Sequence, residues 1–540
     1  MSDATSTQSR LHIGTKIGWG MADAGINVFV FLKSVIIFNF MNSYLGVDAG
    51  LAGLVTALVV LSDMVTDPIV GAMSDRFTSR FGRRRPFMFV GVFLMAGLTY
   101  MTFAVPAGLS GAPAAAWVAV FYALASIAFT MVAVPFGAMA TEMTTDKQER
   151  VTLTGFRMIF ASVGLLLSGL LFAPQVRADF AGGGWIVLSL LMILPVLIAI
   201  FATRNAPTGR HGADAQAPGL LEQYKIVANS PSFLKHMIAY GVMTLGVAII
   251  STGIRSVTED ITASQAQSGA FDDFLSAYEP NERQLVRLGI VEPEDGFTTR
   301  AGDVIDQSVV PIAVGTADFD VSQLDLAFYA AHPYGPEQIG TLKGILNQAI
   351  ASKLSMPFSF LVGLAGFFSA VFALFLLGSI ISQALWVPLA ARIGRDNTLL
   401  IGLIAYGIIL IAYMFVLRSG NLNLIVGLPF LLGACNGCYQ NLPWAILPTM
   451  IDQANQEHGK PCEGVFNGYW LTGQKMANAI GPAIFGIMLG VVGFQESTLG
   501  FQFQNAEASR AMEMLMTLVP GIFFLVAIPI FLWVPKALRH

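Results

Sequence analysis

LAGLVTALVVLSDMVTDPIVGAMSDRFTSRFGRRRP, residues 51–86, joins a long apolar run to an arginine-rich segment and places Asp63 and Asp67 inside the apolar part. The apolar part reaches residue 73 and exceeds the roughly 20 residues that cross a hydrocarbon core about 30 Å thick. Backbone polar groups in lipid must pair within their own segment, so this run predicts a transmembrane helix. Two acidic side chains inside such a helix indicate a functional site, because charge is costly there.

Similar apolar runs recur along the whole chain of 540 residues, which is 55% hydrophobic and only 12% charged. Soluble globular proteins carry about 25% charged residues, and the sequence lacks the alternating strands of a membrane barrel. We therefore predict an all-α membrane protein with twelve transmembrane helices. Their expected ranges are 17–45, 51–73, 87–106, 115–140, 153–175, 183–203, 233–253, 359–391, 397–417, 422–450, 465–492 and 513–535.

The distribution of lysine and arginine predicts the orientation in the membrane, because cytoplasmic loops are enriched in both residues. Five arginines between residues 76 and 85 follow the second predicted span, and basic residues also follow the fourth, sixth, eighth, tenth and twelfth. The alternate loops 46–50 and 107–114 contain none. We expect both termini to be cytoplasmic and the protein to be integral to the plasma membrane (the inner membrane of a bacterium).

A weak internal repeat predicts two halves. Residues 71–86 follow the second span, and the related segment 389–396 follows the eighth, which is the second span of the second six. We assign 1–203 to an amino-terminal six-helix bundle, 204–232 to a cytoplasmic linker and 233–540 to a carboxyl-terminal six-helix bundle. Repeats of this kind enclose a solute cavity near the membrane midplane.

Residues 254–355 interrupt the second half between the seventh and eighth spans. This insert has fifteen acidic residues against six basic ones, and the order of the spans makes it extracytoplasmic. Helical spacing of Phe271, Phe274, Leu275 and Tyr278, and again of Ile339, Leu342, Leu346, Ala349 and Ile350, predicts a small, partly helical cap. A loop without a role in transport, a lid, and a docking surface for an extracytoplasmic partner are the alternatives.

Several classes of function find no support in the sequence. With a net charge of −4 and no basic stripe, we expect no nucleic acid partner; the partners are a small-molecule solute and membrane lipid. Cys435 and Cys438 form an isolated C-x-x-C pair within an apolar run, which favours helix packing over zinc. Neither a metalloprotease, nor a hydrolase, nor a P-loop motif occurs at a suitable position, so we expect no enzyme and no cofactor other than a coupling cation.

Asp63 and Asp67 are the strongest candidates for a coupling site. Their spacing of four residues puts both carboxylates on one helix face. Because close carboxylates repel, one of them should bind a proton or both should share a cation. Na⁺ would suit the pair, since hard cations prefer oxygen ligands. The alternative is a structural pair that is neutralised by Lys475 or Lys33.

Further polar residues inside the spans are candidates for solute binding. Asp23 and Asn27 share one face of the first span, and Arg157 lies in the fifth. Lys475 is in the middle of the eleventh span, where pairing with the two aspartates would join the halves electrostatically. Lys33 points away from the Asn27 face, and pairs with a carboxylate or attracts an anionic solute.

An aromatic and amide group in the tenth and eleventh spans suits a polyhydroxylated or ring-shaped ligand. Packing and anchoring at the membrane interface are the alternative roles for these aromatic residues. The group consists of Tyr439, Gln440, Trp444, Asn467, Tyr469, Trp470 and Gln474.

Taken in order, several of these stretches resemble the glycoside–pentoside–hexuronide:cation symporters, a melibiose permease-like family of the major facilitator superfamily. The matching stretches are Gly18-x-Gly with Asp23 and Asn27, Asp63-x-x-x-Asp67-Pro with Arg80-x-Gly-Arg, Pro135-Phe with Asp146-Lys-x-Glu-Arg, Arg157, and Cys462-Glu with Lys475. The resemblance covers nearly the whole chain except the insert. It implies the major facilitator fold.

The resemblance also implies roles for individual residues. Asp63 and Asp67 would bind Na⁺, Li⁺ or H⁺, and Thr130 would supply a hydroxyl near that cation site. Arg157 and residues on the first and fourth helices would bind a sugar, and Lys475 would bridge near the cation.

Two departures from the family pattern bear on the solute. Melibiose permease holds sugar hydroxyls with carboxylates on the first and fourth helices, where this chain has Asn27 and Ala133. Galactoside specificity therefore does not carry over, and the insert is atypical. Cation-coupled symport of a sugar, glycoside or related solute by alternating access is our first hypothesis. The alternatives are symport of an amphipathic or anionic non-sugar solute, and a membrane receptor or assembly protein that uses residues 254–355.

Overall fold

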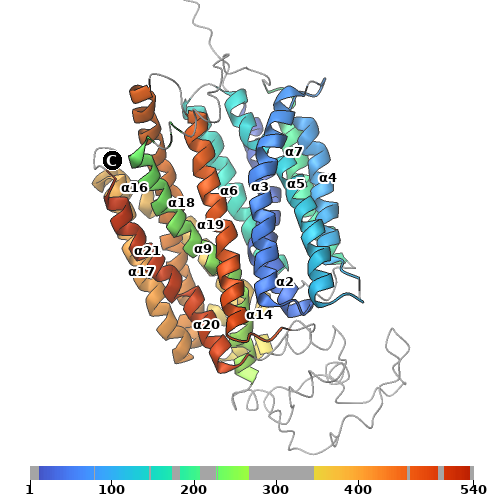
Figure 1. The fold of residues 1–540 in the computed structure, drawn as a ribbon, viewed down its shortest axis with the longest axis vertical. Coiled ribbons are helices and arrows are strands. Elements are labelled where there is room, and N and C mark those ends of the chain that lie inside the picture. Colours follow the sequence, from blue (N-terminus) through green and yellow to red (C-terminus); the bar gives the residue numbers. More distant parts are fainter. Residues whose placement is uncertain are drawn as a thin grey trace, which may run out of the picture.

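A computed structural model describes residues 11–77, 79–106, 108–144, 147–172, 183–206, 225, 227, 229–266, 346–458, 463–496 and 504–534. Across these residues the regular structure is helical throughout, and long helices run side by side along one axis (Figure 1). The predicted helices at Phe271–Tyr278 and around Ile339 and Leu342 lie outside the described residues.

The helices fall into two groups in chain order. The amino-terminal group contains α1 (Ile13–Phe31), η1 (Leu32–Ile36), α2 (Ile37–Tyr44), α3 (Ala49–Arg76), α4 (Arg85–Phe103), α5 (Gly111–Met143), α6 (Lys147–Phe172) and α7 (Gly183–Ala202). The carboxyl-terminal group contains α9 (Pro231–Ala266), α14 (Phe358–Ala365), α15 (Phe367–Ile381), α16 (Gln383–Ile393), α17 (Arg395–Ser419), α18 (Leu422–His458), α19 (Glu463–Val491), α20 (Ala506–Met516) and α21 (Leu518–Leu532).

These helices make twelve crossings, as predicted. Nine segments of the described chain are long and apolar enough to cross a membrane, and two shorter apolar helices lie at Gly155–Gly169 and Ile186–Ala202. The twelfth crossing is α19, with 29 residues. Three crossings are built from consecutive pieces: α1 with η1 and α2, α15 with α16, and α20 with α21. The protein is therefore an integral membrane protein of the all-α class.

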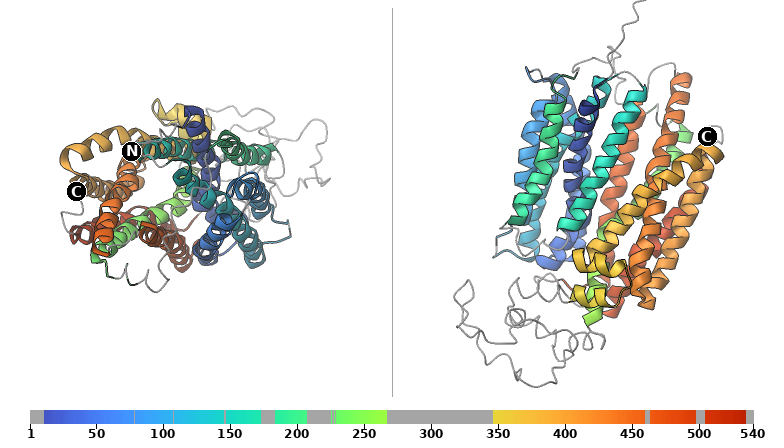
Figure 2. Two further views of the ribbon diagram at one scale, coloured as in Figure 1. Left: turned by 90° about the horizontal axis from the view of Figure 1, so that it is seen from above. Right: turned by 180° about the vertical axis from the view of Figure 1, so that it is seen from behind.

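The two groups of helices lie beside each other and meet along a shared boundary. Viewed along the helices, the blue-to-green helices α1–α7 gather on one side, and the remaining helices gather on the other (Figure 2). Contacts across the boundary join α3 to α19, α6 to α15, and α9 to η1 and α2. Phe38 and Phe485 meet there edge to face, with ring centroids 5.5 Å apart.

Helix α9 corrects the predicted start of the insert. The seventh span was expected to end at residue 253, but α9 continues to Ala266, so the first part of the range 254–355 belongs to this helix. Arg255 Nε donates to Glu259 Oε1 at 3.1 Å, one turn further along the helix. Such pairing supports a helix where apolar periodicity fades. The expected helix around Leu346 is present over 346–352, with Leu346, Ala349 and Ile350 buried.

Close approach of α3 and α19 depends on two glycines. A Cβ atom added at Gly53 would lie 2.6 Å from the carbonyl oxygen of Pro482 and 3.3 Å from the Cα atom of Ala483. Gly486 packs in the same way against the backbone of α3 at Ala49. In a membrane, small residues let helix backbones approach closely, and packing of this kind holds helices together.

We expect Gly53→Val to destabilise the protein, because neither backbone at this contact can move aside for a side chain. Overpacking of this kind costs about 1–3 kcal/mol. The measurement is the thermal unfolding midpoint of purified protein in detergent. Gly97→Val is the matched control, since Gly97 lies in α4 with no atom within 4 Å of an added Cβ. An equal effect of both substitutions would contradict this account of the α3–α19 contact.

Candidate functional site

Asp63, the first of the two aspartates, is buried near the middle of α3 with both oxygens engaged. Its Oδ1 accepts a hydrogen bond of 2.6 Å from Ser126 Oγ on α5. Its Oδ2 lies 2.7 Å from Lys33 Nζ, which comes from η1 of the first crossing. The question that the sequence left open for Lys33 is therefore answered, because this lysine pairs with a carboxylate.

Asp67 follows one turn later on α3 and has a parallel set of partners. Thr130 Oγ1 on α5 donates to Asp67 Oδ1 at 2.8 Å, and Lys475 Nζ on α19 pairs with Oδ2. The Asp67 side chain is 26% exposed, against 2% for Asp63. Asp67 is therefore the more accessible of the two carboxylates, and its lysine comes from the opposite group of helices.

Asp23 and Arg157 form a second ionic cluster between α1 and α6. Arg157 Nε donates to Asp23 Oδ2 at 2.9 Å, and the guanidinium lies 5.3 Å from the centroid of the Phe136 ring. The Trp19 ring stacks on the Phe136 ring, with centroids 4.6 Å apart. Among the described residues, neither Asp23 Oδ1 nor Trp19 Nε1 has a hydrogen-bond partner, although both atoms are buried.

These two unpaired atoms distinguish the cluster of Asp23 and Arg157 from the pair of aspartates on α3, whose oxygens all have partners. Buried polar atoms in proteins are nearly always hydrogen-bonded, so each unpaired one requires an explanation. Here one acceptor and one donor lie beside an arginine that is 38% exposed. Of these groups only the Arg157 guanidinium is partly exposed, whereas Asp23 and Trp19 are buried behind it.

Asn27 makes a more local contact than its predicted role requires. Its Nδ2 donates to the backbone oxygen of Asp23 at 2.8 Å, within its own helix, and the side chain is half-buried. Asp23 and Lys33 are ten residues apart on the first crossing, which corresponds to about 15 Å along a helix. The two ionic clusters are thus separate but share one helix.

The aromatic group predicted in the carboxyl-terminal half is separate from both ionic clusters and lies among α9, α18 and α19. Trp470 is fully buried and stacks on Tyr240, with centroids 4.4 Å apart, and Tyr240 also stacks on Tyr439 at 5.6 Å. Trp444 Nε1 donates to Tyr240 Oη at 3.1 Å. Tyr439 and Trp470 therefore pack the interior of this half, which is the alternative role considered for them.

The remaining members of that group are less enclosed. Gln440 is exposed, Tyr469 is half-buried, and the side chain of Asn467 lies outside the described residues. The contacts of Trp444 with Tyr240 and Trp470 stay within the carboxyl-terminal half.

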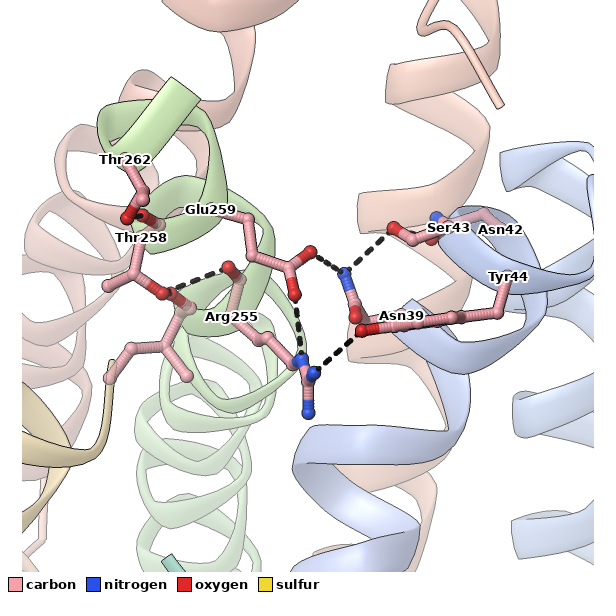
Figure 3. Close-up of polar contacts among 9 residues, drawn as sticks. Asn39, Asn42, Ser43, Tyr44, Arg255, Thr258, Glu259 and Thr262 are labelled. Atoms are coloured by element: carbon pink, nitrogen blue, oxygen red, sulfur yellow. Dashed lines mark hydrogen bonds and ion pairs between the residues drawn. The ribbon is translucent and has the colours of Figure 1, made fainter. Parts of the chain in front are cut away.

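A third polar cluster joins α2 of one half to α9 of the other, and no sequence pattern described above predicted it. Asn39 Nδ2 donates to Glu259 Oε2 at 3.0 Å, and Arg255 donates from Nη2 to Tyr44 Oη at 3.3 Å. Figure 3 shows Asn39 and Tyr44 facing Glu259 and Arg255 across the boundary. Arg255 is 3% exposed. We call Asn39, Tyr44, Arg255 and Glu259 the α2–α9 cluster.

Two sequence signals would have found these missed residues. The spacing of four residues between Arg255 and Glu259 predicts an ion pair on a continuing helix, but the polar composition that follows it suggested a loop. Ser126 lies four residues before Thr130 on α5, so a helix that presents one hydroxyl to the aspartates presents both.

Comparison with known proteins agrees with this architecture. The profile of the family described as MFS/sugar transport protein matches residues 18–271 and 357–535. An uncharacterized symporter of Synechocystis sp. is 25% identical over 97% of this chain and 94% of its own length. The putative glycoside/cation symporter YagG of Escherichia coli is 28% identical over 37% of this chain and 45% of that protein.

Solved structures show the same fold at low sequence identity. The crystal structure of a D-xylose-proton symporter superimposes with a TM-score of 0.54 and 12% identity, and the match covers 98% of each chain. The family profile matches most of this chain on both sides of the insert and agrees with the resemblance seen in the sequence motifs. The chain belongs to the MFS/sugar transport protein family, and it has the major facilitator fold.

Proposed function

We propose that this protein is a secondary active transporter that couples the uptake of a sugar, a glycoside or a related organic solute to a cation, Na⁺ or H⁺. The observation that carries the proposal is the ion pair of Lys475 with Asp67, which joins the two halves at a partly exposed carboxylate deep in the bundle. Several relatives are named symporters, and the E. coli relative is named a glycoside/cation symporter.

The coupling cation acts at Asp63 and Asp67 in this proposal, with Thr130 beside them. A cation or proton that binds Asp67 weakens its attraction to Lys475. Because Lys475 belongs to α19 and Asp67 to α3, that change alters a contact between the halves. Binding of the coupling ion thereby biases the equilibrium between the two arrangements of the bundles, which is the requirement for coupling.

The solute binds at Asp23 and Arg157 in this proposal. The arginine is 38% exposed and offers charged donors, whereas Asp23, Trp19 and Phe136 are buried behind it. A rearrangement of the cluster brings the unpaired Asp23 Oδ1 and the two rings to the solute. Sugars present both hydroxyl edges and apolar ring faces, so the cluster fits their chemistry. The exposed part of Arg157 also suits an anionic group, and a uronate or another acidic solute is the second candidate.

Alternating access requires that one end of the central path be closed while the other is open. The α2–α9 cluster supplies a closure at the end where α9 terminates, which is the extracytoplasmic end in the orientation proposed from the basic loops. Both termini and the 204–232 linker lie on the cytoplasmic side in this orientation. The family and its named relatives are transporters, and we propose no enzymatic activity.

The first test is a screen for solutes. Ligands stabilise the folded state in proportion to the logarithm of their saturation. The thermal unfolding midpoint of purified protein is measured with sugars, glycosides, uronates and amphipathic acids, each with and without Na⁺. We expect one class to raise the midpoint, and that compound serves as the solute in the transport assays below.

Asp67→Asn should abolish gradient-driven uptake in proteoliposomes, because the amide has no negative charge to attract a cation and cannot take up and release a proton. Asp48→Asn is the matched control on the same helix: Asp48 is exposed and caps the start of α3 by accepting from Leu51 N at 2.9 Å, a role that asparagine fills equally well. Unchanged uptake in Asp67→Asn, under Na⁺ and proton gradients alike, would refute the coupling site.

Arg157→Lys should weaken solute binding by about 10- to 100-fold, since a hydrogen bond to a charged group contributes about 1.5–3 kcal/mol. Lysine keeps the charge but loses the planar donors that guanidinium directs at Asp23. The measurement is the solute dependence of the thermal shift. Arg418→Lys, in an exposed pair with Glu513, is the control and should leave the affinity unchanged. Equal affinities in both variants would remove Arg157 from the solute site.

Glu259→Gln should loosen the α2–α9 cluster, because it leaves the buried Arg255 without its charged partner. The readout is a cysteine placed at Ser43, a residue that is buried next to Asn39. A membrane-impermeant maleimide should label this cysteine faster in the Glu259→Gln background than in the protein with Glu259. Glu513→Gln, which breaks the exposed pair with Arg418, should not change the labelling rate. Equal rates in all three would show that the cluster does not close this end.

A further inference from the structure

The aspartate pair on α3 carries two lysine counter-ions rather than one. Lys33 pairs with Asp63 and Lys475 pairs with Asp67, so two negative charges face two positive charges. Ser126 and Thr130 donate to the remaining oxygens. Each of the four carboxylate oxygens therefore has a hydrogen-bonded or ionic partner within the protein.

Several contacts hold the Lys33 side chain in this position. It lies in η1, a wide π-helical turn in which Ile37 N donates to Leu32 O, and such turns recur at functional sites. Its Nζ lies 5.4 Å from the centroid of the Phe129 ring, at a distance typical of cation–π contacts. The lysine side chain is only 15% exposed. An ammonium enclosed in this way has little access to water if it leaves Asp63.

This arrangement is unfavourable for a metal ion at the pair. Na⁺ binds through several oxygen ligands, and the oxygens of Asp63 and Asp67 are already engaged by donors. A third cation would also be repelled by the ammonium groups of Lys33 and Lys475, which already neutralise the two carboxylates. Binding would require one lysine to withdraw, which leaves a buried charge without a partner.

A proton needs no shell of ligands, and the structure already holds a transferable one on the Lys33 ammonium. Passing this proton from Lys33 Nζ to Asp63 Oδ2 across the 2.7 Å contact leaves both groups neutral. Its release to one side of the membrane and replacement from the other side carries one H⁺ without adding a third positive charge and without displacing either side chain. The residue types at the site are compatible with either Na⁺ or H⁺. The geometry of their contacts favours H⁺.

We propose that Lys33 determines the ion selectivity of this site: its ammonium occupies Asp63 in the place of a metal ion, so that transport is coupled to protons and not to Na⁺. The inference rests on the proposed function, in which Asp63 and Asp67 form the coupling site. Lys33 acts as a tethered cation, and its removal leaves Asp63 Oδ2 without its ionic partner.

The test measures Na⁺ binding directly, without transport. Thermal unfolding of the purified full-length protein is followed in NaCl and in choline chloride of equal ionic strength. We expect the wild type to show no Na⁺-specific shift. Lys33→Met keeps the length of the side chain without its charge, and its midpoint should rise with the logarithm of the Na⁺ concentration. The double variant Lys33→Met/Asp63→Asn should lose that rise.

Two control variants separate this effect from the loss of an ion pair in general. Lys33→Arg keeps the positive charge and should remain insensitive to Na⁺. Lys16→Met breaks the 2.8 Å pair with Glu149 on the same first crossing, away from the aspartates, and should also remain insensitive. A structural role of Lys33 predicts lower stability of Lys33→Met but no Na⁺-specific recovery.

Either of two results would overturn the proposal: a Na⁺-specific shift in the wild type as large as that in Lys33→Met, or a folded Lys33→Met that ignores Na⁺. If Lys33→Met does not fold, Lys33→Gln replaces it, because glutamine retains a hydrogen-bond donor for Asp63. Proteoliposome uptake of the screened solute is then compared under proton and Na⁺ gradients. Failure of all gradient-driven uptake would contradict the proposed function, whereas uptake driven by Na⁺ in the wild type would contradict only the role of Lys33.

Discussion

The repulsion between two carboxylates one turn apart on α3 is the constraint that organises the centre of this protein. In an interior of low polarity an uncompensated charge is unstable, and a buried ion pair is strongly destabilised when one partner is removed. Lys33 and Lys475 meet this constraint from opposite sides, and Ser126 and Thr130 complete the hydrogen bonding. Four neighbouring residues are thus explained by one electrostatic requirement.

The same requirement ties the two halves together in a reversible way. Lys475 comes from α19, so the amino-terminal half cannot neutralise Asp67 by itself. Elsewhere along this boundary, Gly53 and Gly486 bring the backbones of α3 and α19 into contact, and the α2–α9 cluster adds polar contacts. Packing of small residues tolerates little sliding, whereas ion pairs respond to the binding of an ion. In the proposed mechanism, the boundary therefore combines rigid contacts with an ion pair whose strength depends on whether the coupling ion is bound.

The sequence predicted much of this arrangement, and its failures have physical causes. Apolar runs predicted all twelve crossings, and the expected facing of Lys475 and the aspartates agrees with the geometry. The partner of Lys33 was left open, because helical angles give the direction of a side chain within its own helix but not the neighbour that lies there. The end of α9 was missed because Arg255 and Glu259 look like loop residues until their partners on α2 are known.

Coupling between a solute and an ion requires an element that both sites contact. In the proposed mechanism the first crossing is this element, since Asp23 pairs with Arg157 in α1 and Lys33 pairs with Asp63 ten residues further along. Helix α5 provides a second link, because Phe136 contacts the Arg157 guanidinium while Thr130 donates to Asp67. A shift of either helix against α3 or α6 changes both clusters together. In the proposed mechanism, the solute site and the cation site lie about 15 Å apart and respond to each other through rigid helices, without a direct contact between solute and ion.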